Sequence, residues 1–163
     1  SLLEPPSDTT LRSFFDRHQE RYQVAERLTF SHVFFSPERR DTAAQDAKDL
    51  LESIDDGNWR QLGDSFMLRR TYTQATPTEI RRDFGSRFMT SLSSLSIGTW
   101  QGPIVSGYGQ HLVKLTQRYA ARESTFDEAV DRVRNDFNLD RRNEANATEL
   151  HAMRENYRIR IER

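Results

Sequence analysis

Apolar side chains recur along this chain with two different periods, and each period predicts one type of element. Over residues 28–35 they alternate with polar ones, which predicts a β-strand with two distinct faces. Residues 102–115 alternate on both sides of a glycine-rich turn, and we expect a strand, a turn and a second strand there. The pattern also predicts a short strand at 66–68 and a closing strand at 157–161.

Helical spacing of apolar residues predicts four helices. The first is expected near residues 9–22, with Asp8 as its cap, and the second over 41–56, with Gly57 as its stop. The third begins at the capping signal Thr76-Pro77-Thr78-Glu79 and carries Ile80, Phe84 and Phe88. The fourth is expected from a cap at Ser124 to about Asn156, with an apolar stripe formed by Phe126, Ala129, Val130, Val133 and Phe137.

The order of these elements predicts an α+β fold with a central unit and helical ends. We place the central unit at residues 26–118, an N-terminal helical segment at 1–25 and a C-terminal helical segment at 119–163. Isolated helices of ~12–15 residues are marginal in water, and both end segments carry an apolar stripe. We therefore expect the two end segments to pack on each other.

Charge and composition restrict the classes of partner. Charged residues make up 30% of the chain, but their signs nearly cancel to a net charge of −1. A nucleic-acid surface needs an excess of basic side chains, so no nucleic-acid partner is expected. The chain has no cysteine, which excludes disulfides, thiol catalysis and cysteine-ligated metals. This composition also suits a protein of the periplasm or cell envelope.

The chain begins with Ser1 rather than methionine, so we expect a processed or excised fragment. No run of apolar residues in the sequence is long enough to span a bilayer. Whether a signal peptide or membrane anchor lies outside this fragment therefore stays open.

Two of the four histidines lie in strand patterns. His18 and His151 fall in charged helical stretches and are expected to be solvated. His32 and His111 have apolar neighbours on their own strand faces, and an unpaired buried polar group costs about 1–3 kcal/mol. Each imidazole therefore needs a hydrogen-bond partner. If their strands are antiparallel neighbours, the two imidazoles could bond to each other.

Three interpretations of His32 and His111 compete. A metal site needs further ligands, and neither cysteine nor an ordered set of acidic residues accompanies the pair. A nucleophile–base pair needs an activated hydroxyl on a strand-turn-helix elbow, which the sequence does not show. The third interpretation is a structural pair beneath a pocket, which we favour. No metal or cofactor is expected.

A series of motifs runs through residues 26–118 in a specific order and spacing. They are Phe30-Ser31-His32-Val33-Phe34-Phe35, the alanine-rich helix at 41–56, Gly63-Asp64, Phe84 and Phe88, Gly98, Gly102-Pro103, and Gly107-Tyr108-Gly109-Gln110-His111-Leu112-Val113-Lys114. This arrangement resembles the parvulin (PpiC-type) family of peptidyl-prolyl cis-trans isomerases. The end helices also resemble those that frame the isomerase domain in periplasmic foldases and chaperones of this family.

The resemblance implies a parvulin-like antiparallel four-stranded sheet wrapped by helices, flanking N- and C-terminal helices, and a shallow apolar pocket for proline. It also implies a catalytic and substrate-binding set. The set comprises the paired core histidines His32 and His111, the proline-pocket residues Phe84 and Phe88, and the hydroxyl positions Ser106 and Tyr108. For the two phenylalanines, helical spacing is equally typical of plain core packing.

The sequence departs from the family pattern before the Gly63-Asp64 turn. Full-pattern parvulins carry a longer segment there, with a cysteine or aspartate that faces the substrate amide. Here residues 57–62 lead almost directly to the turn, and Asp55, Asp56 and Asp64 are out of register with that position. Catalysis is therefore expected to be weak.

Two functions of different classes stay open. One is a peptidyl-prolyl isomerase and protein-folding factor for exported or unfolded proteins, with proline-containing peptides or unfolded segments as its partners. The alternative is a non-catalytic peptide-binding chaperone or scaffold module on the same fold, because a fold does not fix an activity.

Overall fold

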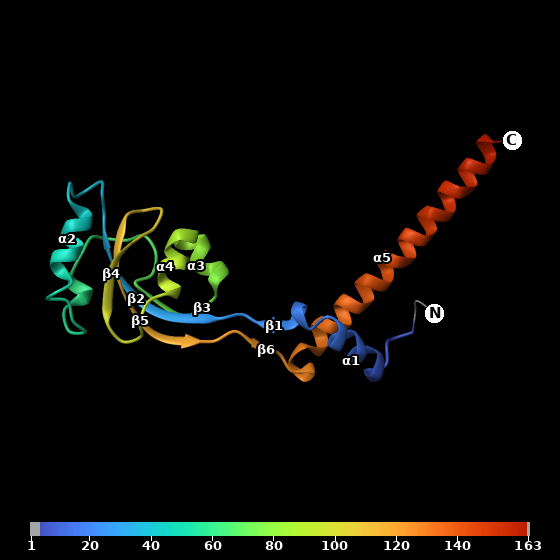
Figure 1. The fold of residues 1–163 in the computed structure, drawn as a ribbon, viewed down its shortest axis with the longest axis horizontal. Helices are drawn as coiled ribbons and strands as arrows, with labels where there is room; N and C mark the ends of the chain where they lie inside the picture. Colours follow the sequence, from blue (N-terminus) through green and yellow to red (C-terminus); the bar gives the residue numbers. More distant parts are fainter. Residues whose placement is uncertain (1–3, 163) are drawn as a thin grey trace. The chain divides into compact units, whose positions relative to one another are not determined.

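The computed structural model describes residues 4–162, which form two compact units (Figure 1). One unit is continuous, from Ala25 to Arg122, and the other combines the chain up to Val24 with the chain from Glu123 onward. Residues 1–3 and 163, the outer tips of the two predicted end segments, lie outside the described residues. Short strands β1 (Gln23–Val24) and β6 (Arg122–Glu123) pair as a two-stranded sheet.

The continuous unit is built on a four-stranded antiparallel sheet, which confirms the predicted fold class. Its strand order is β3 (Thr71–Ala75), β2 (Arg27–Phe35), β5 (Gln110–Tyr119) and β4 (Trp100–Val105). Figure 1 shows the long strands β2 and β5 running side by side through the middle of the unit. The predicted strand-turn-strand therefore consists of β4, the turn and β5.

The alternation in β2 gives the sheet two different faces. Leu28 and Phe30 point to a core covered by α3 (Pro77–Phe84) and α4 (Ser86–Ser93), whereas Val33 and Phe35 point to a core covered by α2 (Ala43–Leu50). The first core contains Leu28, Phe30, Tyr72, Ala75, Ile80, Phe84, Phe88, Met89, Leu92, Ile104, Val113 and Leu115. The second contains Val33, Phe35, Ala43, Ala47, Ile54, Trp59 and Leu112.

Two helices of this unit differ from the sequence prediction. The predicted third helix is divided at Gly85, whose φ of +97° lies in the region that favours glycine, so Phe84 ends α3 and Phe88 belongs to α4. The predicted helix at 41–56 is shorter, because α2 ends at Leu50. The Asp55 carboxylate then accepts hydrogen bonds from the backbone N–H groups of Gly57 and Asn58, which stabilises a turn instead.

The edge strand β3 was missed, and the strand predicted at 66–68 is wrong. Residues 66–68 form irregular backbone, whereas 71–75 pair with β2. Tyr72 and Ala75 both face the core although they are three positions apart, because Gln74 has a φ of +48° and the register with β2 shifts there. This bulge conceals the strand period in the sequence.

Apart from the residues of the β1–β6 pair, the second unit is helical. Helix α1 (Asp8–Arg17) and the short 3-10 turn η1 (Gln19–Tyr22) pack against α5 (Phe126–Ile161) through a shared apolar cluster. The cluster comprises Leu11, Phe14, Phe15, Tyr22, Phe126, Ala129 and Val133, with Val130 and Phe137 at its margin. The Tyr22 hydroxyl donates a hydrogen bond of 2.8 Å to Asp136. Each terminal stripe therefore finds its partner within this unit.

The ends of these helices correct three predictions. Ser7 caps α1 in place of Asp8, and Thr125 caps α5 in place of Ser124, with Glu128 completing a capping box. The closing strand predicted at 157–161 is wrong, because α5 continues through Ile161. No strand among residues 4–162 pairs with that stretch, so its backbone groups are satisfied by the helix. None of the described helices has the length and hydropathy of a membrane span.

Candidate functional site

The two central strands bring His32 and His111 into direct contact, as predicted. His32 lies opposite Val113, and His111 lies opposite Phe34, so both imidazoles project from the same face of the sheet. Their Nδ1 atoms are 3.1 Å apart, and both residues are buried, with exposed fractions of 1% and 0%. The pair lies beside the aromatic core, with Phe84 edge-on to both rings.

The surrounding acceptors fix the direction of every hydrogen bond in this network. The Arg69 carbonyl can only accept, so Nε2 of His32 donates to it at 2.7 Å. Nδ1 of a neutral His32 is then an acceptor, and Nδ1 of His111 donates to it. Nε2 of His111 consequently accepts from the Ser106 hydroxyl at 2.7 Å, and that hydroxyl oxygen accepts from the Tyr108 backbone N–H at 3.0 Å.

Both histidines are neutral at ordinary pH. Burial lowers the pKa of His32 to about 4. Burial, followed by the neighbouring His32, also lowers the pKa of His111 well below its usual value. Because all four ring nitrogens are engaged, the pair is a fixed connector between Arg69 and Ser106.

A pocket of about 500 Å³ opens beside this network. Three segments form its walls: the end of β2 with the loop after it, the irregular segment after Asp64, and the turn before β5. Its lining residues are Phe34, Ser36, Glu38, Arg39, Ser65, Phe66, Met67, Gly107 and Tyr108. The histidine network therefore reaches two of these segments, at Arg69 and at Tyr108.

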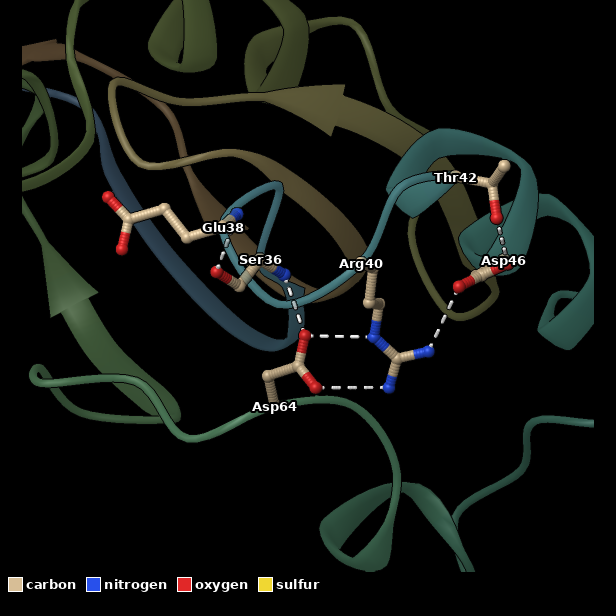
Figure 2. A network of polar contacts seen from close by, with 6 residues as sticks. All are labelled: Ser36, Glu38, Arg40, Thr42, Asp46 and Asp64. Atoms are coloured by element: carbon tan, nitrogen blue, oxygen red, sulfur yellow. Dashed lines mark hydrogen bonds and ion pairs between the residues drawn. The ribbon is translucent and has the colours of Figure 1, made fainter.

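A second polar network fixes the loop after β2 to the segment after Asp64 (Figure 2). The Asp64 carboxylate accepts two hydrogen bonds from Arg40, at 2.9 and 3.0 Å, and one from the Ser36 backbone N–H at 2.7 Å. The same guanidinium reaches Asp46 of α2 at 3.2 Å, and Asp46 accepts from Thr42. These contacts with Arg40 lower the pKa of Asp64, so the carboxylate is ionised and holds two walls of the pocket together.

The structure separates the site residues expected from the sequence into two groups. Tyr108 lines the pocket and is 41% exposed. Ser106 is buried, and its hydroxyl donates a hydrogen bond to His111. Phe84 and Phe88 are 1% and 0% exposed and do not line the pocket. Their rings stack on each other with centroids 4.3 Å apart, as residues of the aromatic core.

Sequence reasoning did not find Phe66, Met67, Phe34 and the Arg40–Asp64 pair. Phe66 is the side chain between the pocket and the core: it lines the pocket, and its ring stacks on Phe84 with centroids 5.8 Å apart. The position of Phe66 two residues after the Gly63-Asp64 turn was the available signal, since loop residues often form binding sites.

The acidic residues near the shortened segment make contacts of their own. Asp55 accepts from backbone N–H groups in its turn, Asp56 pairs with Lys114 at 2.6 Å, and Asp64 is bound to Arg40. None of the three lines the pocket, where the acidic side chain is Glu38. Among residues 4–162 no group of three or more histidine, aspartate or glutamate side chains is arranged to hold a metal ion.

Comparison with known families and structures adds an independent result. The model of the PPIC-type PPIase domain matches residues 6–131. A solved structure from Campylobacter jejuni, described with PEB4 and the periplasmic protein Cj1289 as SurA-like chaperones, is 16% identical with a TM-score of 0.51. That match covers 91% of this chain and 61% of the other. The peptidylprolyl isomerase PrsA from Bacillus anthracis is 16% identical with a TM-score of 0.47, over 83% of this chain and 56% of that one.

The match to the Campylobacter jejuni structure shows a shared fold rather than a whole-protein activity. The chain spans about three fifths of the length of the Campylobacter jejuni chaperone, 61% by alignment. No curated protein sequence matches it. At this level of identity the shared feature is the architecture, and an activity has to be argued from the site.

Proposed function

Because the chain belongs to the PpiC-type peptidyl-prolyl isomerase family, we propose that it binds extended proline-containing or unfolded segments in the pocket beside the histidine pair and isomerises their prolyl bonds. The observation that carries this proposal is the combination of a pocket of about 500 Å³ with two buried, neutral, fully bonded imidazoles behind it. Phe34, Met67 and Tyr108 give the pocket apolar and aromatic contact surface.

Prolyl isomerisation suits a site of this composition. The reaction makes and breaks no covalent bond, and its barrier of ~18–20 kcal/mol reflects the loss of amide resonance in the twisted state. A protein lowers that barrier by holding the proline ring and by surrounding the less polar twisted amide with apolar groups. A proton acceptor is not required, which agrees with histidines whose nitrogens are all occupied.

The proposed turnover is weak. Asp55, Asp56 and Asp64 all contact other groups and lie outside the pocket lining. Phe84 and Phe88, which the family resemblance assigns to the proline pocket, are closed off in the core. These two features favour the alternative of a non-catalytic peptide-binding module, in which the pocket holds a segment without accelerating its isomerisation.

We also propose that the protein works outside the cytoplasm, in the periplasm or cell envelope, on exported or unfolded proteins. The support is the family membership together with the absence of cysteine from the sequence. A membrane anchor outside these residues is compatible with this proposal. The helical unit, with its exposed apolar side chains on α5, is a second surface that a client segment can contact.

Exchange NMR on a short proline-containing peptide tests the function. We expect added protein to increase the cis–trans exchange rate and to shift peptide resonances, with turnover well below that of a full-pattern parvulin. Matched peptides with alanine in place of proline measure binding alone. Binding without faster exchange supports the non-catalytic alternative, and no binding of either peptide rejects both functions for this pocket.

A further inference from the structure

Phe66 is in contact with five rings around the site. It packs against the aromatic core from the pocket side and is itself only partly buried. Its ring is edge-on to His32 and His111, with centroids 5.0 and 5.4 Å away, and stacked on Phe84 at 5.8 Å with an interplanar angle of 14°. Phe34 and Tyr108 contact it from the pocket walls, at 4.9 and 5.4 Å.

These contacts place Phe66 between a segment bound in the pocket and the residues that the family resemblance assigns to catalysis and proline binding. Phe84 is 1% exposed and the two histidines are 1% and 0% exposed, so none of them is accessible from the pocket while Phe66 stays in position. A proline ring that stacked on the same side of Phe84 would need the space that the Phe66 ring now fills.

The backbone around Phe66 is held at its ends and free in its middle. Asp64 is anchored by Arg40 and Ser36, and its N–H donates to the Phe34 carbonyl at 2.7 Å. On the other side, the Arg69 and Arg70 carbonyls accept hydrogen bonds from His32. Between these anchors, within the part of the chain that the structure describes, the backbone of residues 65–68 makes no hydrogen bond.

From this geometry we infer that Phe66 is a displaceable plug of the proline site and determines which segments the site accepts. The inference rests on the proposed function, since it names the residue that controls entry to the same pocket. In the closed form, the Phe66 ring occupies the place of a substrate proline. In the open form, residues 65–68 move while the anchors at Asp64 and Arg69 stay bonded, and a proline ring contacts Phe84 in its place.

The plug accounts for both parts of the functional proposal, which are the binding of proline-containing segments and the weak turnover. Exchanging one ring for another keeps the apolar surface of Phe84 covered, so opening is coupled to substrate binding and costs little in exposed area. A site that is open for only a fraction of the time binds more weakly in proportion to that fraction. Segments that offer an apolar ring are thereby favoured over those that do not.

Shortening the plug is the direct test. In Phe66→Ala, and to a smaller degree in Phe66→Leu, we expect the affinity for a proline peptide and the rate of cis–trans exchange to rise. A rise of roughly tenfold follows if the open form is about a tenth of the population. Intermolecular NOEs between the proline ring and the Phe84 ring are expected to become stronger in both variants.

Tyr119→Ala is the matched control. It removes an exposed aromatic side chain from the same unit, at the end of β5 away from the pocket lining. Its affinity and exchange rate are expected to equal those of the unchanged protein. Amide spectra of all variants establish that they are folded, and Phe66→Leu keeps the test decisive if Phe66→Ala unfolds.

The outcomes separate the plug from the function. If the unchanged protein and the folded Phe66 variants bind and isomerise equally well, the proposed function stands and the plug is rejected. A loss of binding in both variants also rejects it, because Phe66 is then a contact for the substrate. If no form of the protein binds or isomerises any proline peptide, the proposed function fails, and the plug has no site to control.

Discussion

The two faces of the central sheet both bury apolar side chains, but they differ in whether they also bury titratable groups. On the face covered by α3 and α4, the aromatic core surrounds two completely buried imidazoles. On the face covered by α2, Trp59 and Trp100 approach each other with ring centroids 5.7 Å apart, and the nearby ion pair of Lys114 with Asp56 reaches solvent.

This difference indicates what the histidines contribute. The α2 face shows that the sheet can be covered without burying a titratable group. The polar network on the other face instead connects β2 and β5 to the segments that form the pocket, through Arg69 and Tyr108. Burying His32 and His111 costs desolvation free energy, and we infer that this cost is offset by the hydrogen bonds that hold the pocket walls.

A large aromatic truncation on each face provides the strongest test of this comparison. Phe88→Ala, in the face with the histidines, and Trp59→Ala, in the face with α2, are each expected to lower the free energy of unfolding by about 3–5 kcal/mol. Only Phe88→Ala is expected to weaken peptide binding as well, because Phe84 stacks on Phe88 and Phe66 stacks on Phe84.

Urea unfolding gives the stability of both variants, and peptide titration by NMR gives the binding. Equal effects of the two truncations on peptide affinity would show that the faces do not differ in function. An unchanged affinity in folded Phe88→Ala would restrict Phe88 to core packing.

The second prediction concerns acid. His32 and His111 have a pKa below 6.5 in the folded protein, so protons bind first to the unfolded chain. The stability that depends on their neutral forms is complete above about pH 6.5 and declines as the pH falls toward the folded pKa, which is about 4 for His32. At pH 5 the expected loss is about 2 kcal/mol for each histidine.

Asp64 extends this dependence to lower pH. Its pKa is lowered in the folded protein, so its contribution is present above its ordinary pKa of 3.8 and is lost as the pH falls below that value.

Urea unfolding between pH 7 and 4 isolates the histidines. The double variant His32→Leu/His111→Leu should abolish the decline over that range, and a decline that persisted in it would assign the acid sensitivity to other groups. The single variant His111→Leu should cost roughly 1–3 kcal/mol at pH 7, because it leaves His32 without its donor.

The strands that hold the site were predictable because their apolar period is strict. The alternation in 28–35 gave β2 with the correct faces, and with the block at 107–114 it led to the contact between His32 and His111. The stripes of the end helices were equally readable, since each one meets its partner directly.

The pocket was less predictable because its residues belong to irregular backbone. Phe66 and Met67 have no periodic pattern, and the strand assigned to 66–68 followed from local apolar content alone. The pairing of Arg40 with Asp64 joins positions that are 24 residues apart, which a single sequence does not reveal. The closing strand at 157–161 failed for a related reason: a strand depends on a neighbour, and alternation does not supply one.

The smallest expected effect belongs to the ion pair on the α2 face. Lys114 and Asp56 are 2.6 Å apart, but the Asp56 side chain is 75% exposed, so solvent screens their attraction. Asp56→Asn is expected to change the free energy of unfolding by less than about 1 kcal/mol, in contrast to His111→Leu on the opposite face. It should also leave peptide affinity unchanged, because Asp56 does not line the pocket. Urea unfolding at low and high salt measures the electrostatic part. A loss comparable to that of His111→Leu would mean that both faces depend on their polar groups, and the histidine network would no longer be what distinguishes the face that carries the pocket.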